Sequence, residues 1–190
     1  MENEDDIKLV SDYLNGEEDV LNEIVKKYYK TLYRFLFNYL NGSSESADLT
    51  QEVFLKVWKN IKKYNKKYSF KTWIFTIARN TAIDFLRKKR ESVFSDFNNE
   101  DGSNVFEDTI PDDLPSASEV FAQIENAEKL KKELDKLPII YREIIILKYQ
   151  EEMDFSEIGT VLKRPKETVK SQHRRALIML RKNVDSSKFL

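Results

Sequence analysis

Cysteine is absent from this chain of 190 residues, which also has only one histidine, four glycines and four prolines. The absence of cysteine excludes a disulfide framework, a thiolate zinc site and an iron–sulfur cluster, and it fits a reducing compartment. The scarcity of glycine argues against a Gly-rich phosphate loop and against a fold built on many tight turns. Helix is therefore the expected secondary structure.

Long apolar runs are also missing, because no stretch approaches the ~18 residues that a membrane span needs. The sequence begins MENEDD, which is acidic, whereas a signal peptide begins with a basic segment. We therefore expect a cytoplasmic protein with no direct membrane insertion.

The net charge of −1 conceals four blocks of opposite sign. Residues 1–20 carry one base and eight acids, 21–90 carry sixteen and five, 91–128 carry none and eleven, and 129–190 carry fifteen and nine. Charge segregated in this way is typical of two basic modules that face a polyanion and are separated by an acidic tether. Nucleic acid is the polyanion that the pattern favours, and a merely solvated surface is the alternative.

The N-terminal part, 1–92, is expected to be a helical domain. Apolar residues recur at helical spacing in three segments: 20–39, 46–62 and 70–90. Asn41-Gly42 is expected to end the first helix. In the second segment the charged residues fall opposite the apolar face, so one face packs and the other is free to bind.

A basic loop with interleaved tyrosines, KKYNKKYS at 62–69, separates the last two of these helices. Cations follow phosphates while rings such as Tyr64 and Tyr68 stack on unpaired bases, so the mixture suits single-stranded nucleic acid. The alternative is a solvated loop whose tyrosines only pack.

The segment 93–127 is predicted to be an acidic flexible linker. It has no Lys or Arg, is rich in Asn, Ser and Asp, contains two prolines and shows no steady period. Its apolar residues are too many for an inert tether, so we expect part of it to order against a partner.

The C-terminal part, 128–190, is predicted to be a helix-turn-helix domain. Asp154 and Glu157 have the spacing of a capping box at the start of a short helix, and Pro165 starts a second helix after a tight turn. Gly159 lets the two helices cross closely. The second helix carries hydroxyl and guanidinium groups on its outward face, which suits a major groove. The fold class is therefore all-α, with two small helical domains joined by an acidic flexible linker.

Two distant motifs resemble the extracytoplasmic-function subfamily of bacterial sigma factors, over essentially the full chain. DLTQEVFLKVW at 48–58 and FKTWIFTIARNTAIDFLRKKR at 70–90 are similar to the segment that binds polymerase and reads the minus-10 element. LDKLPIIYREIIILKYQEEMDFSEIGTVL at 134–162 and TVKSQHRRALIMLR at 168–181 are similar to the segment that reads the minus-35 element.

The resemblance implies roles for individual residues. Contact with the coiled coil of the polymerase clamp is implied for Asp48, Gln51 and Glu52. Asn80 matches a position that reads a base flipped from the minus-10 strand, a task that needs a stacking surface beside a hydrogen-bonding amide. The residues implied at minus-10 DNA are Tyr64, Tyr68, Arg79, Asn80, Arg87, Lys88, Lys89 and Arg90. The residues implied at minus-35 DNA are Arg164, Lys166, Thr168, Lys170, Ser171, Arg174 and Arg175.

The chain departs from the family pattern at a few positions. The turn is Lys163-Arg164-Pro165 where the family commonly begins with Gly, so the sequence leaves the turn geometry open. Gly159 replaces a typical Ala, which we expect to be harmless at a helix crossing. His173 falls on the inward face, where a core histidine is favoured over a base contact, and Trp73 is likewise expected to pack in the core rather than stack on a base.

The implied partners are core RNA polymerase, promoter DNA and an anti-sigma factor, with no small-molecule substrate. No catalytic residues, metal site or cofactor are expected, because the sequence has no nucleophile–base pair and no metal-ligand spacing. One alternative is a helix-turn-helix repressor or activator that binds duplex DNA alone, although the acidic stripe at 48–59 and the tyrosine–lysine loop argue against it. Another alternative is a helical adaptor without a role at nucleic acid.

Overall fold

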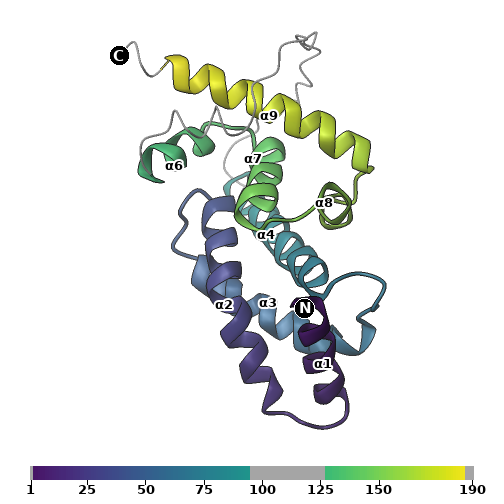
Figure 1. Ribbon diagram of the computed structural model, residues 1–190. Coiled ribbons are helices and arrows are strands. Elements are labelled where there is room, and N and C mark those ends of the chain that lie inside the picture. The colour runs from purple at the N-terminus through teal and green to yellow at the C-terminus, as the bar shows by residue number, and fades with distance from the viewer. Residues whose placement is uncertain (1, 95–126, 187–190) are drawn as a thin grey trace.

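A computed structural model describes residues 2–94 and 127–186, with side chains described for 4–89 and 129–183. Every regular element in these ranges is helical, which confirms the all-α expectation. In chain order (Figure 1) they are α1 (Glu2–Leu14), α2 (Val20–Tyr39), α3 (Ser46–Asn60), the 3₁₀ turn η1 (Ile61–Lys63), α4 (Phe70–Phe94), α6 (Ala127–Asp135), α7 (Ile139–Ile145), the π-helical turn η2 (Ile146–Gln150), α8 (Phe155–Leu162) and α9 (Lys166–Ser186). No helix in the described ranges has both the length and the apolar character that crossing a membrane requires.

The N-terminal helices pack around α2, whose broad apolar face is buried along its length. The helix ends as expected, since Asn41 and Gly42 both have positive φ (55° and 81°) and the Gly42 N–H donates to the Phe37 carbonyl at 2.7 Å. Helix α1 was not expected from the sequence. It is anchored by the buried carboxylate of Asp6, which accepts from the Tyr28 hydroxyl at 2.5 Å and lies 2.6 Å from the Lys27 ammonium.

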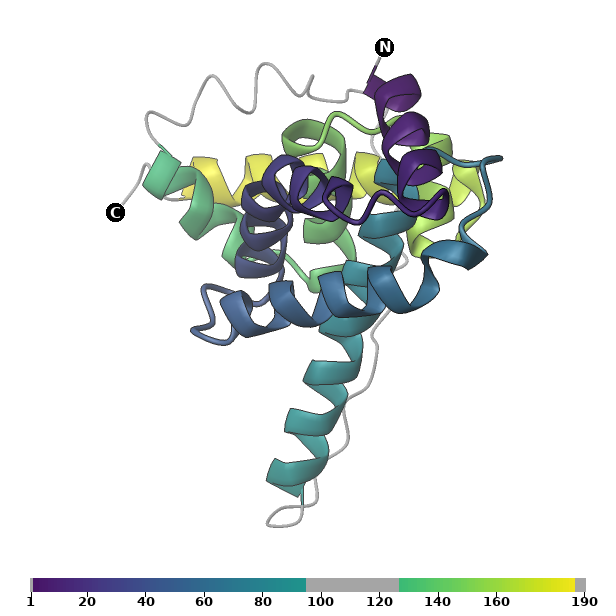
Figure 2. The ribbon, with the colours of Figure 1, turned by 90° about the horizontal axis from the view of Figure 1, so that it is seen from below.

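Helices α3 and α4 pack against each other, and α4 is the longest helix of the described chain. Figure 2 shows the C-terminal part of α4 extending away from the other helices. The cations on this part, such as Lys88, are consequently exposed to solvent.

The expected helix-turn-helix is formed by α8 and α9. The Asp154 carboxylate accepts from the backbone N–H groups of Ser156 and Glu157, and the Glu157 carboxylate accepts from the Asp154 N–H at 3.0 Å, so the capping box is present. The chain then reverses at Lys163, which has left-handed angles (φ 54°, ψ 45°). Helix α9 crosses over α7 and α8 and packs on both (Figure 1).

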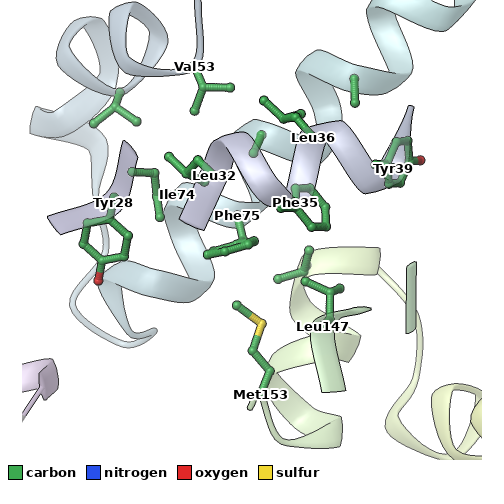
Figure 3. Close-up of a cluster of buried hydrophobic side chains, with 14 of the residues drawn as sticks. Tyr28, Leu32, Phe35, Leu36, Tyr39, Val53, Ile74, Phe75, Leu147 and Met153 are labelled. Atoms are coloured by element: carbon green, nitrogen blue, oxygen red, sulfur yellow. The ribbon is translucent and has the colours of Figure 1, made fainter. Parts of the chain in front are cut away.

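One buried core runs through both halves of the chain. Phe35 of α2 and Phe75 of α4 meet edge to face, with ring centroids 5.2 Å apart, and Leu147 and Met153 of the C-terminal half complete the same cluster (Figure 3). The sequence predicted two modules but not that they would pack together. The linker predicted at 93–127 lies almost wholly outside the described residues; its first two residues belong to α4 and its last begins α6.

Candidate nucleic-acid interface

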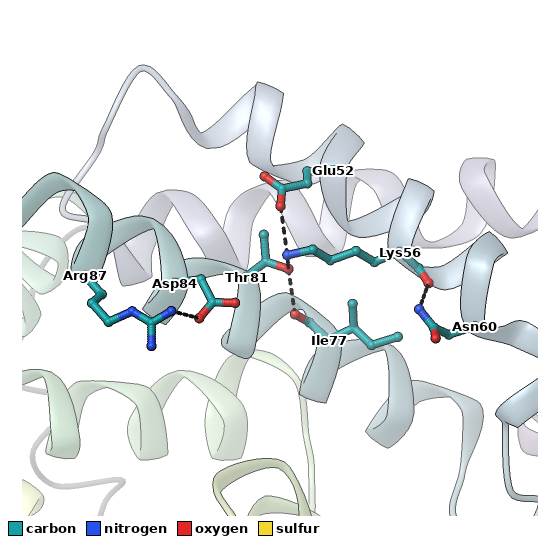
Figure 4. A network of polar contacts seen from close by, with 7 residues as sticks. All are labelled: Glu52, Lys56, Asn60, Ile77, Thr81, Asp84 and Arg87. Carbon is teal, nitrogen blue, oxygen red and sulfur yellow. Dashed lines mark hydrogen bonds and ion pairs between the residues drawn. The ribbon is translucent and has the colours of Figure 1, made fainter.

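The acidic stripe expected on α3 is exposed. Asp48, Gln51 and Glu52 all face solvent, and Glu52 forms an ion pair with Lys56 at 2.8 Å (Figure 4). Leu55 is half exposed and shares this helical face, since it lies three and four residues beyond Glu52 and Gln51. Leu55 was not expected from the sequence. The face therefore combines carboxylates with apolar surface.

A hydrogen bond from Lys56 links the same face of α3 to α4. The Lys56 ammonium also donates to the Thr81 hydroxyl at 3.0 Å, and Thr81 in turn donates to the Ile77 carbonyl (Figure 4). The exposed face of α3 and the outward face of α4 are thereby held in a defined relation.

The two tyrosines of the basic loop have different surroundings. The Tyr64 ring packs on Phe70 and Trp73, at centroid distances of 5.5 and 5.4 Å, and its hydroxyl donates to the Tyr68 carbonyl at 2.8 Å. Burial, with a smaller contribution from the charge of Asp6, raises the pKa of Tyr64. Tyr68 is the more exposed ring, at 43%, and is the one open to a stacking partner. Trp73 packs against the core, as expected.

Asn80 and Arg79 are neighbours on α4 with contrasting environments. The Asn80 amide is partly exposed and makes no hydrogen bond to any other residue that the structure describes. Arg79 is almost fully buried in an ion pair with Glu143 of α7. In this arrangement Asn80 is open to a ligand and Arg79 is not.

The cations at the end of α4 are only loosely held. Arg87 lies 3.4 Å from Asp84 (Figure 4), Lys89 lies 3.7 Å from Glu45, and Lys88 is exposed. Exposed pairs of this kind contribute little free energy. The side chains of Arg87 and Lys88 therefore remain available to phosphates. The side chain of Arg90 lies outside the described residues.

Helix α9 presents the polar face expected of a recognition helix. Lys170 pairs with Glu167 at 2.9 Å, and the Ser171 hydroxyl donates to the Thr168 carbonyl at 2.9 Å. Arg174 and Arg175 are partly buried, and their Nε atoms are shielded from solvent without a hydrogen-bond partner in the described part of the chain. Lys166 is exposed at the start of the helix.

Glu143 joins residues implied at both DNA elements. The Arg79 Nε donates to one carboxylate oxygen at 2.9 Å, and the Arg164 Nη1 lies 3.1 Å from the other. Arg164 also donates to the Gln172 side chain at 3.1 Å. Burial, followed by the charge of Glu143, raises the pKa of the nearby Tyr39. Glu143 was not expected from sequence, where the available signal was an acid inside the apolar run of α7.

A polar groove lies between the tyrosine loop and the helix-turn-helix. It has a volume of about 430 Å³, and its lining residues come from the loop, α8, the turn and the start of α9: Tyr68, Ser156, Gly159, Thr160, Lys163, Arg164, Pro165 and Lys166. A residue implied at minus-10 DNA and two implied at minus-35 DNA therefore line the same groove.

His173 is half-buried and hydrogen-bonded, as expected. Its Nε2 atom is 2.8 Å from the Tyr149 hydroxyl, and its ring meets Phe155 edge to face at 5.1 Å. Burial, followed by the charge of Lys148, lowers the pKa of His173. Its ring therefore packs between Tyr149 and Phe155.

Two protein families match the chain in succession. Residues 24–92 match sigma-70 region 2, and residues 127–180 match sigma-70 region 4. The first match contains the α3 stripe, the tyrosine loop and most of α4, and the second contains α6 to α8 and most of α9.

Curated relatives agree with these matches. The chain is 34% identical over 118 residues to the ECF RNA polymerase sigma factor SigW of Bacillus subtilis (strain 168), covering 60% of this chain and 62% of that protein. It is 30% identical over 120 residues to SigX of the same organism, covering 62% and 59%. The chain thus spans about three fifths of the length of these relatives.

Solved structures agree on the fold. CnrH, solved in complex with the cytosolic domain of CnrY, has a TM-score of 0.68 at 18% identity, covering 95% of this chain and 97% of that one. The sigma factor RpoE of Bartonella quintana, solved with the anti-sigma factor NepR, has a TM-score of 0.65 at 22% identity, covering 86% and 96%.

Proposed function

Since this chain belongs to the extracytoplasmic-function subfamily of sigma factors, we propose that it binds core RNA polymerase in the cytoplasm and directs promoter-specific initiation of transcription. It would recognise and melt the minus-10 element and read the minus-35 element, while the polymerase supplies the chemistry. The observation that carries the proposal is that regions 2 and 4 follow each other in order and each presents its own polar face, which is exposed on α3 and partly exposed on α9. In this proposal residues 1–92 bind core polymerase and recognise the minus-10 element, residues 93–127 form a linker, and residues 128–190 recognise the minus-35 element.

The polymerase contact is assigned to the exposed face of α3. Asp48, Gln51 and Glu52 supply polar and charged groups, and Leu55 supplies apolar surface within the same patch. Such a mixture suits a protein partner, because apolar area contributes most of the affinity while charges select the partner and speed association.

Minus-10 recognition is assigned to the tyrosine loop and α4. The exposed Tyr68 ring offers a stacking surface, and Asn80 offers an amide with no partner in the described part of the chain. A flipped base needs both groups, because stacking offsets the cost of unpairing and the amide reads the base edge. The cations Arg87, Lys88, Lys89 and Arg90 would hold the strand by its phosphates without reading sequence.

Minus-35 recognition is assigned to α9 and the turn before it. Thr168, Lys170, Ser171, Arg174 and Arg175 lie on a helix that follows a tight turn, which is how a recognition helix enters a major groove. Arg164 and Lys166 lie at its start, where they would contact phosphates once Arg164 is released from Glu143.

An anti-sigma factor is proposed as the regulatory partner. The support is the likeness to CnrH and to RpoE of Bartonella quintana, which were solved with the cytosolic domain of CnrY and with the anti-sigma factor NepR.

The test is transcription in vitro, with the purified chain and core RNA polymerase on fragmented DNA from the source genome. Discrete transcript starts that require the chain and share two upstream elements are expected. An absence of chain-dependent starts, together with no binding to core polymerase, would overturn the proposal in favour of an independent helix-turn-helix regulator.

A further inference from the structure

The polar groove between the tyrosine loop and the helix-turn-helix carries charge of one sign. Lys163, Arg164 and Lys166 contribute three cations, and none of the described residues that line the groove is acidic. A cleft lined by one sign of charge concentrates ions of the opposite sign, because its walls focus the electric field. The groove is therefore suited to an anion.

Two of the three cations are free to meet an anion. The Arg164 guanidinium is engaged by Glu143 and Gln172, whereas Lys163 and Lys166 are exposed and form no ion pair with any residue that the structure describes. A lysine ammonium is a compact charge on a flexible stem, and in this form it commonly binds phosphate. The proposed function assigns no DNA contact to Lys163, so the charge of Lys163 has no role in it.

Hydroxyl groups of α8 add hydrogen-bonding capacity to the same groove. Ser156 and Thr160 lie one turn apart on this helix, and Ser156 is exposed. The Thr160 hydroxyl donates to the Ser156 carbonyl at 3.1 Å, whereas the Ser156 hydroxyl makes no hydrogen bond to another residue in the described part of the chain. A phosphate oxygen in the groove thus finds a hydroxyl donor as well as the lysine charges.

The tyrosine loop supplies an aromatic ring to the groove. The Tyr68 ring is 43% exposed and contacts no other ring among the described residues, and the Lys67 ammonium stands 6.0 Å from its centroid. Tyr64 of the same loop, in contrast, packs on Phe70 and Trp73. An exposed ring beside cations can stack on a base, and such stacking tolerates any base because each has a π-face.

The size and the two kinds of lining group together indicate the class of ligand. The volume of about 430 Å³ lies within the range of small-molecule sites, roughly 300–1,000 Å³. Phosphate alone would leave the Tyr68 ring unused, and a base alone would leave the lysines unused. A single nucleotide, which has a base at one end and phosphate at the other, uses both.

We propose that the polar groove binds a free nucleotide, whose base stacks on Tyr68 and whose phosphates are held by Lys163, Lys166 and the Ser156 hydroxyl. This site is a property of the chain alone and is measurable without polymerase or promoter. Its consequence rests on the proposed function: Tyr68 and Lys166 are assigned to promoter DNA, so a bound nucleotide competes with the promoter for them.

The experiment is isothermal titration calorimetry of the purified full chain with adenosine triphosphate. The ionic strength is held fixed, because salt screens charges at an exposed site. Adenosine and inorganic triphosphate are titrated separately, since each offers only one half of the ligand. We expect adenosine triphosphate to bind roughly ten-fold more tightly than either. In nuclear magnetic resonance spectra the backbone amide signals of Gly159 and Thr160, which line the groove, should shift during the titration.

Two substitutions remove the two halves of the site. Lys163→Gln removes a cation, and Tyr68→Leu removes the ring. Each should weaken the binding of adenosine triphosphate roughly ten-fold. Tyr68→Leu should leave the affinity for inorganic triphosphate unchanged, which a general loss of folding would not do.

Lys170→Gln and Tyr33→Leu are the matched controls. Lys170 is an exposed lysine of α9, paired with Glu167, and Tyr33 is a ring of α2 that is 36% exposed. Neither residue lines the groove. Both variants should bind adenosine triphosphate as the wild type does.

A single-stranded oligodeoxynucleotide tests the other source of the same chemistry. If it binds and is weakened by Lys163→Gln and Tyr68→Leu, while adenosine triphosphate does not bind, the groove belongs to the DNA surface and the inference fails. Equal affinity for adenosine triphosphate and inorganic triphosphate, or equal losses in the control variants, would also overturn it, because either result shows general attraction of polyanions.

The outcomes separate this inference from the proposed function. Binding of adenosine triphosphate that is weakened by Lys163→Gln and Tyr68→Leu, and kept by both controls, supports the nucleotide site even if no chain-dependent transcription is found. In that case only the proposed function fails. An absence of nucleotide binding overturns the site even if transcription depends on the chain.

Discussion

The carbonyl oxygen of Arg164 lies directly over Gly159, so that a Cβ atom added at Gly159 would stand 2.8 Å from it. The close approach is therefore made by the backbone of the turn, and the Arg164 N–H donates back to the Gly159 carbonyl at 2.9 Å. Gly159 was expected to be a harmless replacement for alanine at a close helix crossing. The geometry gives the glycine a specific role, because a backbone oxygen cannot swing aside as a flexible side chain can.

Gly159→Ala should destabilise the chain by about 1–3 kcal/mol, since the added methyl forces the turn away from α8. Urea unfolding followed by circular dichroism gives the free energy. Ser156→Ala, at an exposed position of the same helix, is the control and should cost much less. A Gly159→Ala variant as stable as the wild type would mean that the turn relaxes without cost.

Lys163→Gly should stabilise the chain by about 1 kcal/mol. Lys163 has φ 54° and ψ 45°, a left-handed conformation that costs a residue with a Cβ atom roughly 1–2 kcal/mol and that glycine adopts freely. Glycine also has more freedom in the unfolded chain, which offsets part of the gain. Thermal unfolding measures the difference.

Lys170→Gly is the matched comparison for Lys163→Gly. It removes the same charge from an exposed position inside α9, where glycine should cost about 1 kcal/mol. The two substitutions should therefore change stability in opposite directions. A loss of stability in both would show that the left-handed turn carries no strain.

The stability of the chain should fall as the pH drops below about 6.5 because of His173. Burial lowers its pKa in the folded state from the ordinary 6.5, so the unfolded chain takes up a proton that the folded chain resists. Above pH 6.5 His173 is neutral in both states and does not lower the free energy of unfolding. As the pH falls from 6.5 toward the lowered pKa, the free energy of unfolding decreases by at most about 1.4 kcal/mol per pH unit.

Nuclear magnetic resonance can follow this titration directly, because His173 is the only histidine. The imidazole signals should titrate below pH 6.5, and His173→Gln should remove that part of the pH dependence of urea unfolding. A titration at or above 6.5 would contradict the effect of burial.

Asn80→Ala should damage promoter opening more than polymerase binding. The amide makes no hydrogen bond within the described part of the chain, so its removal leaves the fold intact while the base edge loses its partner. Permanganate footprinting of the melted region and a polymerase binding assay give the two quantities. Asp48→Ala, on the exposed face of α3, should damage polymerase binding more than promoter opening. Equal losses in both assays for Asn80→Ala would assign Asn80 to a structural role.

Much of the local structure was predictable because its causes lie within a few residues. Helix α2 begins at Val20 and stops before Asn41-Gly42, as apolar spacing and a turn-forming pair predict, and the Asp154–Glu157 box starts α8. Helix α1 was missed because its sequence is mostly acidic and polar, and its anchor, Asp6, meets Tyr28 only after the chain has folded back.

Some features of the candidate site were likewise predictable from local sequence, and others depended on the packing of distant helices. The sequence by itself determined the helices, the charge blocks and the exposed polar faces of α3 and α9, because periodicity and composition act locally. Only the tertiary structure decided that the two regions close on each other and that Arg79 pairs with Glu143, 64 positions away along the chain. No local pattern encodes that pairing, because a charge so distant in sequence becomes a partner only when apolar burial brings the two helices together.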